Sequence, residues 1–237
     1  FVSVGLNYDR VLEDRVLPTA AATPKGQRPR FAFELGTFLG FALRNLLGRL
    51  TGRWYRYGYA CVSFGRPLSL RRHLGERGVD LRSLPEARRF PEIELLGQRL
   101  IGEVGRAVPA LPVSLVAYAM LAAPGPLSAL ELKGAVFDLM RDLSKAGADV
   151  YIPRTDQDYA VDVGRRMLEL RRLVVEDAGL YRIVAAERGL LAYYANALVH
   201  HLGREPWPVT PAMAVAADGG ASPGELPRAT ARPAPGP

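Results

Sequence analysis

Cysteine and histidine are scarce in this sequence. Cys61 is the single cysteine among 237 residues, so the chain cannot form an internal disulfide. This excludes a disulfide-stabilised secreted scaffold and favours a reducing compartment. The three histidines also lack zinc-ligand spacing, because only His200 and His201 are neighbours and adjacent residues chelate poorly. We therefore expect no bound metal.

Long hydrophobic runs are also missing. The uncharged stretch 107–130 comes nearest, but prolines at 109, 112, 124 and 126 divide it. The remaining apolar pieces are shorter than the ~20 residues that cross roughly 30 Å of hydrocarbon. We therefore predict a buried core helix over 112–123 rather than a membrane span.

Acidic residues are outnumbered by basic ones. The chain has 31 Lys and Arg against 24 Asp and Glu, a formal net charge of +7. Such a charge attracts nucleic acids, anionic membrane surfaces or phosphorylated metabolites. No zinc finger, RNA-binding aromatic pattern or basic heptad is present, so we expect no nucleic-acid partner. A predicted apolar helix over 33–50, which carries Arg44 and Arg49, keeps contact with a membrane surface open.

The first ten residues have the alternation of a strand. Val4 and Leu6 alternate with smaller residues, which predicts one face in a core. Polar residues 7–10 follow, and Asp9 could cap a short helix after them. A second strand is predicted within 56–70. A short helix is expected to begin after Ser69.

Beyond residue 81 the pattern is mainly helical. Ser128 and Glu131 have the spacing of a capping box, which marks one helix start. A tail rich in Pro, Gly and Ala follows residue 204, and we expect it to be disordered. The predicted helices cover 93–108, 112–123, 128–147, 162–179 and 190–202, with short strands at 148–153 and 180–187.

Three stretches carry a resemblance to a known family. VSVGLNYDRVLE (2–13) and VSFGRPLSL (62–70) resemble the third and fourth sequence blocks of the glycerol-3-phosphate acyltransferase family, in the same order. LLAYYANALVHHL (190–202) resembles that family's Tyr-Tyr-x-Asn helix. The resemblance spans most of 1–202. It implies an α/β fold in which 1–80 form the C-terminal part of a mixed-sheet acyltransferase domain, 81–204 a mostly helical region and 205–237 the tail.

The resemblance also implies a reaction. A histidine of an H-x4-D pair deprotonates the 1-hydroxyl of glycerol 3-phosphate, which attacks the thioester of acyl-CoA or acyl-carrier protein. In this sequence only His200 has an acid, Glu205, at that spacing, and its place at a helix end favours a structural role. The family's catalytic block precedes the third block, so we expect it to lie before Phe1. The chain is then a fragment with no catalytic residue of its own.

Candidate binding residues follow from the third block. In the family this block lies beside the glycerol-phosphate site, which implies substrate-binding roles for Tyr8, Asp9, Arg10 and Glu13. Arg10 could pair with the phosphate, or it could form an ion pair with Asp9 or Glu13 at a helix start.

The fourth block suggests architecture rather than chemistry. Gly65 and Pro67 are expected to turn the chain after a strand, and Ser69 to cap the following helix. Two positions depart from the family pattern. Ser3 stands where many members have Pro, and Arg66 where an acidic residue is common.

The remaining expectations concern partners and location. The implied partners are glycerol 3-phosphate, an acyl donor as co-substrate and a membrane surface, with no further cofactor. The implied location is peripheral, at the cytoplasmic face of a membrane, in phospholipid biosynthesis. A non-catalytic membrane-surface or regulatory module stays open as an alternative. An acyltransferase acting on dihydroxyacetone phosphate stays open as well.

Overall fold

The computed structural model describes residues 1–11, 14 and 58–209. The helix predicted over 33–50, Glu13 and the end of the tail lie outside these residues. The elements in chain order are β1 (Val4–Tyr8), β2 (Ala60–Phe64), α3 (Leu70–Glu76), α4 (Glu86–Ala107), α5 (Pro112–Ala122), β3 (Leu127–Ser128), α6 (Ala129–Lys145), α7 (Gln157–Leu170), β4 (Val174–Asp177), β5 (Leu180–Ile183) and α8 (Arg188–Val199).

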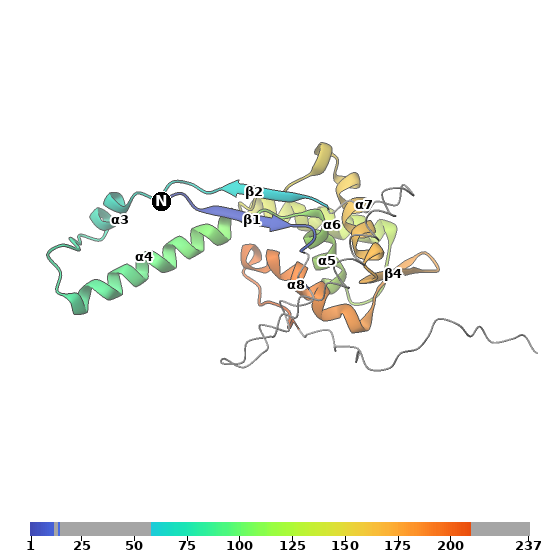
Figure 1. Cartoon of the computed structure of the whole chain (residues 1–237). Coiled ribbons are helices and arrows are strands. Elements are labelled where there is room, and N and C mark those ends of the chain that lie inside the picture. Colours follow the sequence, from blue (N-terminus) through green and yellow to red (C-terminus); the bar gives the residue numbers. More distant parts are fainter. Residues whose placement is uncertain (12–13, 15–57, 210–237) are drawn as a thin grey trace, which may run out of the picture.

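Two regions differ in shape. Residues 110–209, here called the helical body, pack α6, α7 and α8 around α5 (Figure 1). Residues 70–107, here called the arm, extend α3 and α4 away from the body, and β1 and β2 lie along the arm's inner end (Figure 1). The structure thus joins an extended N-terminal part to a helical C-terminal part.

Helix α5 is the centre of the body. It carries no charged residue, and its residues 112–121 are all buried. This confirms the predicted core helix over 112–123. Among the described residues, no helix is long and apolar enough to cross a membrane.

The capping box at the start of α6 forms as predicted. The Ser128 hydroxyl accepts a hydrogen bond from the Glu131 amide, and the Glu131 carboxylate accepts one from the Ser128 amide. Two amides that the helix leaves without partners are thereby satisfied. At the other end, Gly147 takes a positive φ of 81° just beyond the helix.

The chain combines helices and strands, in agreement with the α/β class. β1 and β2 pair antiparallel, with Val4 opposite Phe64 and Tyr8 opposite Ala60. The second sheet has the order β3-β5-β4 and is also antiparallel. The mixed sheet expected from the resemblance is therefore not found in the described part of the chain. The parallel pairing described there is an isolated bridge at 110 and 150.

The helix predicted over 162–179 was wrong at both ends. α7 begins at Gln157, where the Asp156 carboxylate caps it through the Tyr159 amide, and it ends at Leu170. Residues 174–177 form β4 instead, because a tight turn at Ala178 and Gly179 folds them back on β5. Both turn residues have positive φ, as a two-residue hairpin loop requires.

Two other boundaries also shift. The strand predicted at 148–153 is reduced to the bridge at Val150 and a short 3-10 turn that begins at Pro153. α4 begins at Glu86 rather than at 93 and continues through Pro91. Residues beyond 204 still pack on the body, since Trp207 lies against Tyr118 with ring centroids 4.9 Å apart.

The predicted buried face of β1 is the exposed one. Val4, Leu6 and Tyr8 are 42%, 53% and 44% exposed. The face with small side chains packs inward instead, because Gly5 lies directly on the end of α4. A Cβ at Gly5 would lie 2.0 Å from the carbonyl oxygen of Ala107, so this close approach needs glycine.

Candidate functional site

The polar residues after β1 lie at its carboxyl end, as predicted, and pack toward the body. The Asn7 side-chain amide donates to the carbonyl of Pro109 at 2.8 Å, and its oxygen accepts from the Tyr8 amide at 2.9 Å. Tyr8 is exposed and Arg10 is half-buried. Asn7, which was not among the predicted site residues, therefore anchors this segment to the residues that precede α5.

Asp9 is fully buried and holds two backbone segments together. One carboxylate oxygen accepts from the Tyr59 amide and the other from the Val113 amide, both at 2.9 Å. Val113 is the second residue of α5, so Asp9 caps that helix. The short helix predicted after Asp9 lies mostly outside the described residues. Burial raises the pKa of Asp9 to about 6, against the opposing effect of the two amides.

A second buried carboxylate joins this segment to α8. The Tyr194 hydroxyl donates to Asp14, and the Arg171 guanidinium forms an ion pair with the same carboxylate. Arg171 also donates to the Tyr194 hydroxyl at 2.6 Å. The Val11 amide is a further donor to that hydroxyl, at 3.3 Å. Burial and the bond to Asp14 raise the pKa of Tyr194, so its hydroxyl stays protonated.

These contacts surround a cavity of about 340 Å³ at the end of β1. The third block and the Tyr-Tyr-x-Asn helix, which are far apart in sequence, both line it. The lining residues are Asn7, Tyr8, Val11, Ser114, Tyr193, Tyr194, Asn196, Ala197 and Val209. We call this the β1-end cavity.

The asparagine of the Tyr-Tyr-x-Asn helix closes the edge of that cavity. Asn196 exchanges two hydrogen bonds of 2.8 Å with the backbone of Trp207, one from its amide and one to its oxygen. Its side chain therefore holds residues 207–209 against α8. In this helix, Tyr194 and Asn196 each fix a separate backbone segment beside the cavity.

The fourth block takes the capping role expected of it, but the turn expected at Gly65 and Pro67 is not found, because residues 65–68 continue alongside residues 1–3. The amide of Gly65 donates to the Ser3 carbonyl at 2.8 Å, which extends the pairing of the two N-terminal strands. The Ser69 hydroxyl accepts from the Arg72 amide at 3.3 Å and caps α3. Pro67 lies between these two points.

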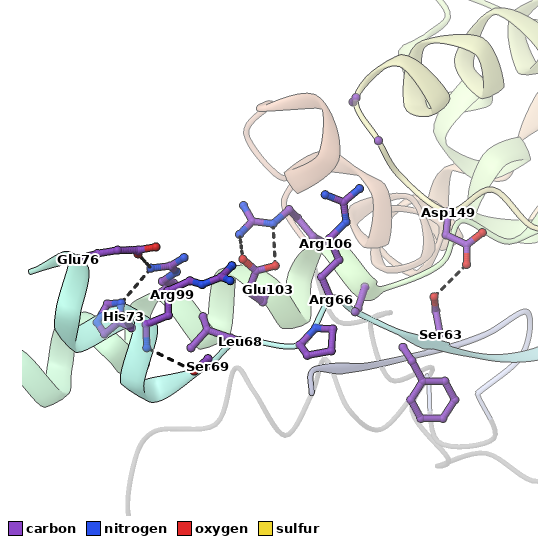
Figure 2. Close-up of a pocket in the computed structure, with 17 residues that line it drawn as sticks. Ser63, Arg66, Leu68, Ser69, His73, Glu76, Arg99, Glu103, Arg106 and Asp149 are labelled. Carbon is purple, nitrogen blue, oxygen red and sulfur yellow. Dashed lines mark hydrogen bonds and ion pairs between the residues drawn. The ribbon is translucent and has the colours of Figure 1, made fainter. Parts of the chain in front are cut away.

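The fourth block also lines the larger cavity, of about 700 Å³. Its walls are residues 63–69, α3, the C-terminal half of α4 and residues 146–149 (Figure 2). Four arginines from two segments of the chain share it. They are Arg66, Arg72, Arg99 and Arg106, together with the acids Glu76, Glu103 and Asp149. We call this the arginine cavity.

The three histidines have structural partners. The His200 and His201 rings bond the carbonyls of Gly105 and Val108 at 2.7 and 2.9 Å, so they satisfy the end of α4. These bonds give His200 a structural role, so its spacing to Glu205 needs no catalytic explanation. His73 is buried in α3 and accepts from Arg99.

Metal chemistry has no support in residues 1–11, 14 and 58–209. No group of three or more His, Cys, Asp or Glu that could hold a metal ion occurs there. The functional arrangement described so far consists of backbone bonds, buried carboxylates and arginines.

The sequence model of the glycerol-3-phosphate acyltransferase C-terminal region matches residues 43–208, more than half of the chain. The chain belongs to this family. The match includes the fourth block and the Tyr-Tyr-x-Asn helix, while the third block lies before it. No match was found among curated proteins. Membership associates the chain with glycerol-3-phosphate acyltransferases and with lipid biosynthesis, with glycerol 3-phosphate as the substrate.

Proposed function

We propose that the chain is part of a glycerol-3-phosphate 1-O-acyltransferase. The reaction transfers a fatty acyl group from acyl-CoA or acyl-carrier protein to glycerol 3-phosphate and gives lysophosphatidic acid. The observation that carries the proposal is the β1-end cavity, which the third block and the Tyr-Tyr-x-Asn helix line together. Two stretches that separately resemble one enzyme family thus meet at one site.

Within this site we assign the glycerol phosphate to the neighbourhood of Tyr8 and Arg10. Arg10 follows the carboxyl end of β1, and a guanidinium can bind phosphate through two parallel hydrogen bonds. Both oxygens of Asp9 already accept backbone amides, so we assign Asp9 to positioning this segment. Direct contact of Asp9 with substrate stays a prediction, and Glu13 lies outside the described residues.

The catalytic base is proposed to come from residues outside this sequence. None of the three histidines is followed by Asp at the fifth position, and His200 and His201 bond the end of α4. Purified residues 1–237 should therefore transfer no acyl group from acyl-CoA to glycerol 3-phosphate. Turnover by this chain alone would contradict the assignment.

Binding of glycerol 3-phosphate tests the site itself. Titration calorimetry on the 237-residue chain should show binding that Arg10→Lys weakens about ten- to a hundredfold, because losing a charged hydrogen bond costs roughly 1.5–3 kcal/mol. Arg82→Ala, an exposed arginine of the arm, is the control and should change nothing. Equal binding by Arg10→Lys, Arg10→Ala and the unchanged chain would return Arg10 to a structural role. Dihydroxyacetone phosphate, titrated in parallel, tests the related substrate.

A peripheral membrane location is a second part of the proposal. α4 exposes an apolar stripe at Phe90, Ile93, Ile101 and Val104, with exposed fractions of 67%, 46%, 74% and 42%. The chain also carries a net charge of +7. We expect salt-sensitive flotation with anionic vesicles and release by carbonate. Binding that resists carbonate, or no binding, would contradict it. This stripe is also what favours the alternative of a non-catalytic membrane-surface module.

A further inference from the structure

The arginine cavity has more positive charge than its own acids neutralise through ion pairs. Arg106 pairs with Glu103 at 2.6 Å, and Arg99 lies 3.5 Å from Glu76. The third acid, Asp149, accepts a hydrogen bond from the Ser63 hydroxyl. Two paired arginines therefore line one side of the cavity on α4.

The other two arginines have no such pairing. Among residues 1–11, 14 and 58–209, neither Arg66 nor Arg72 forms an ion pair with a carboxylate. Arg66 is nevertheless close enough to contribute to the lowered pKa of Glu103, whose main cause is the hydrogen bond from Arg106. Two guanidinium groups on the segment opposite α4 are therefore available to an anion entering the cavity.

A buried histidine at the same cavity also lacks an acceptor. His73 is 6% exposed, and its Nδ1 lies 2.9 Å from a guanidinium nitrogen of Arg99 (Figure 2). Because a guanidinium only donates, Nδ1 accepts, and the neutral ring then carries its proton on Nε2. Nε2 is buried and has no hydrogen-bond partner among the described residues. A buried donor without an acceptor is costly, so this wall of the cavity holds an unsatisfied polar group beside the arginines.

We propose that the arginine cavity binds a small molecule with more than one phosphate group. Arg66 and Arg72 are its first contacts, and Arg106 joins them when an anion competes with Glu103. The volume of about 700 Å³ exceeds what glycerol 3-phosphate needs and accommodates a nucleotide-sized group. Given the proposed function, on which this identification of the ligand rests, the phosphates of coenzyme A fit this chemistry.

Inorganic pyrophosphate and coenzyme A are the probes, titrated into the purified 237-residue chain by calorimetry. We expect saturable binding of both that Arg66→Ala and Arg72→Ala each weaken about tenfold, as expected for losing one charged hydrogen bond. Arg71→Ala is the matched control, since Arg71 is the exposed neighbour in α3 and does not line the cavity. Glu103→Gln frees Arg106 and should tighten binding of pyrophosphate.

Three results would contradict the proposal or its assignment to the acyl donor. No saturable binding of either probe would overturn the proposal. Equal losses in Arg71→Ala and Arg72→Ala, with unchanged circular dichroism, would also overturn it, because general surface charge would then explain the binding. Binding of pyrophosphate without coenzyme A would retain a phosphate site and overturn the donor assignment. Glycerol 3-phosphate titrated against Arg10→Ala and Arg72→Ala tests the proposed function separately, because only the first should weaken it.

Discussion

The helical body and the arm bury their apolar residues to very different degrees. In the body, one cluster joins α5, α6, α7 and α8, and α5 is buried on all sides. In the arm, Ala107 is the one residue of α4 classed as buried, and His73 the one of α3. The paired strands repeat the arm's pattern, since Val62 and Phe64 opposite β1 are also exposed.

This difference shows what an apolar pattern can and cannot predict. Periodicity identifies the face of an element that avoids water. It does not state whether the described chain supplies the surface that covers that face. In the body the covering helices are part of the same region, so the prediction for α5 held. For β1 the pattern placed Val4 and Leu6 inside, but the opposite face of the strand, which carries Gly5, packs inward instead.

The largest expected effect breaks the buried ion pair that ties Asp14 to the body. Among the described residues, Arg171→Leu would leave the buried Asp14 carboxylate with the Tyr194 hydroxyl as its partner, and breaking such a pair costs about 3–5 kcal/mol. Chemical denaturation should show this loss in the free energy of unfolding. Arg166→Leu, an exposed arginine of α7, is the control and should stay within about 0.5 kcal/mol of the unchanged chain.

A second prediction uses the pH dependence of Asp9, at the junction of strands and body. Its pKa is raised from 3.8 to about 6. Between these two pH values the carboxyl group is therefore protonated in the folded state and ionised in the unfolded state. The stabilisation is complete below about pH 4 and disappears as pH rises through 6. It amounts to up to about 3 kcal/mol at about 1.4 kcal/mol per pKa unit.

Denaturation at pH 4 to 7 of the unchanged chain and of Asp9→Asn isolates this contribution. As pH rises, the free energy of unfolding of the unchanged chain should fall relative to that of Asp9→Asn. A difference that stays constant over this range would show that Asp9 does not titrate between its two expected pKa values.

Close helix packing inside the body gives a third prediction. A Cβ at Gly164 would lie 2.4 Å from the carbonyl oxygen of Pro112, so Gly164→Ala should cost roughly 1–3 kcal/mol through overpacking of α7 on α5. Gly134→Ala on α6 meets no atom within 4 Å and should stabilise by up to about 1 kcal/mol. Thermal unfolding measures both. Equal shifts would mean that helix propensity, and not packing, decides at these positions.

Much of the fold was readable from local signals. The capping box of α6, the cap at Ser69 and the apolar run of α5 were correct because each depends on residues close in sequence. The hairpin at Ala178 and Gly179 was missed because valines and charges in 174–177 also fit a helix, and the positive φ of Ala178 gives no sequence signal.

The candidate site depended on contacts between distant residues. Sequence placed Asp9 and Arg10 at the end of a strand, which is correct. It could not show that Asp9 caps α5, because Val113 is 104 positions away. The partnership of Asp14 with Arg171 and Tyr194 is equally remote, although the Tyr-Tyr-x-Asn resemblance did mark Tyr194. The arginine cavity was missed because its arginines come from separate segments that folding brings together.

The smallest predicted effects come from removing a serine cap at one helix start in each of the two regions. Ser128→Ala and Ser69→Ala each remove a side-chain acceptor at a helix start, which costs about 1 kcal/mol at either place. In α6 the loss should lower the global free energy of unfolding, because Leu132, Val136 and Leu143 of that helix lie in the core. In α3 it should appear only as local opening.

Hydrogen exchange of backbone amides separates these outcomes. Ser69→Ala should speed exchange in α3 about fivefold, the factor equivalent to 1 kcal/mol, while leaving α5 unchanged. Ser128→Ala should speed exchange of the slowest core amides, since they exchange through global unfolding. If Ser69→Ala also accelerated the amides of α5, the arm and the body would unfold as one unit. The contrast between them would then be one of burial alone, and not of stability.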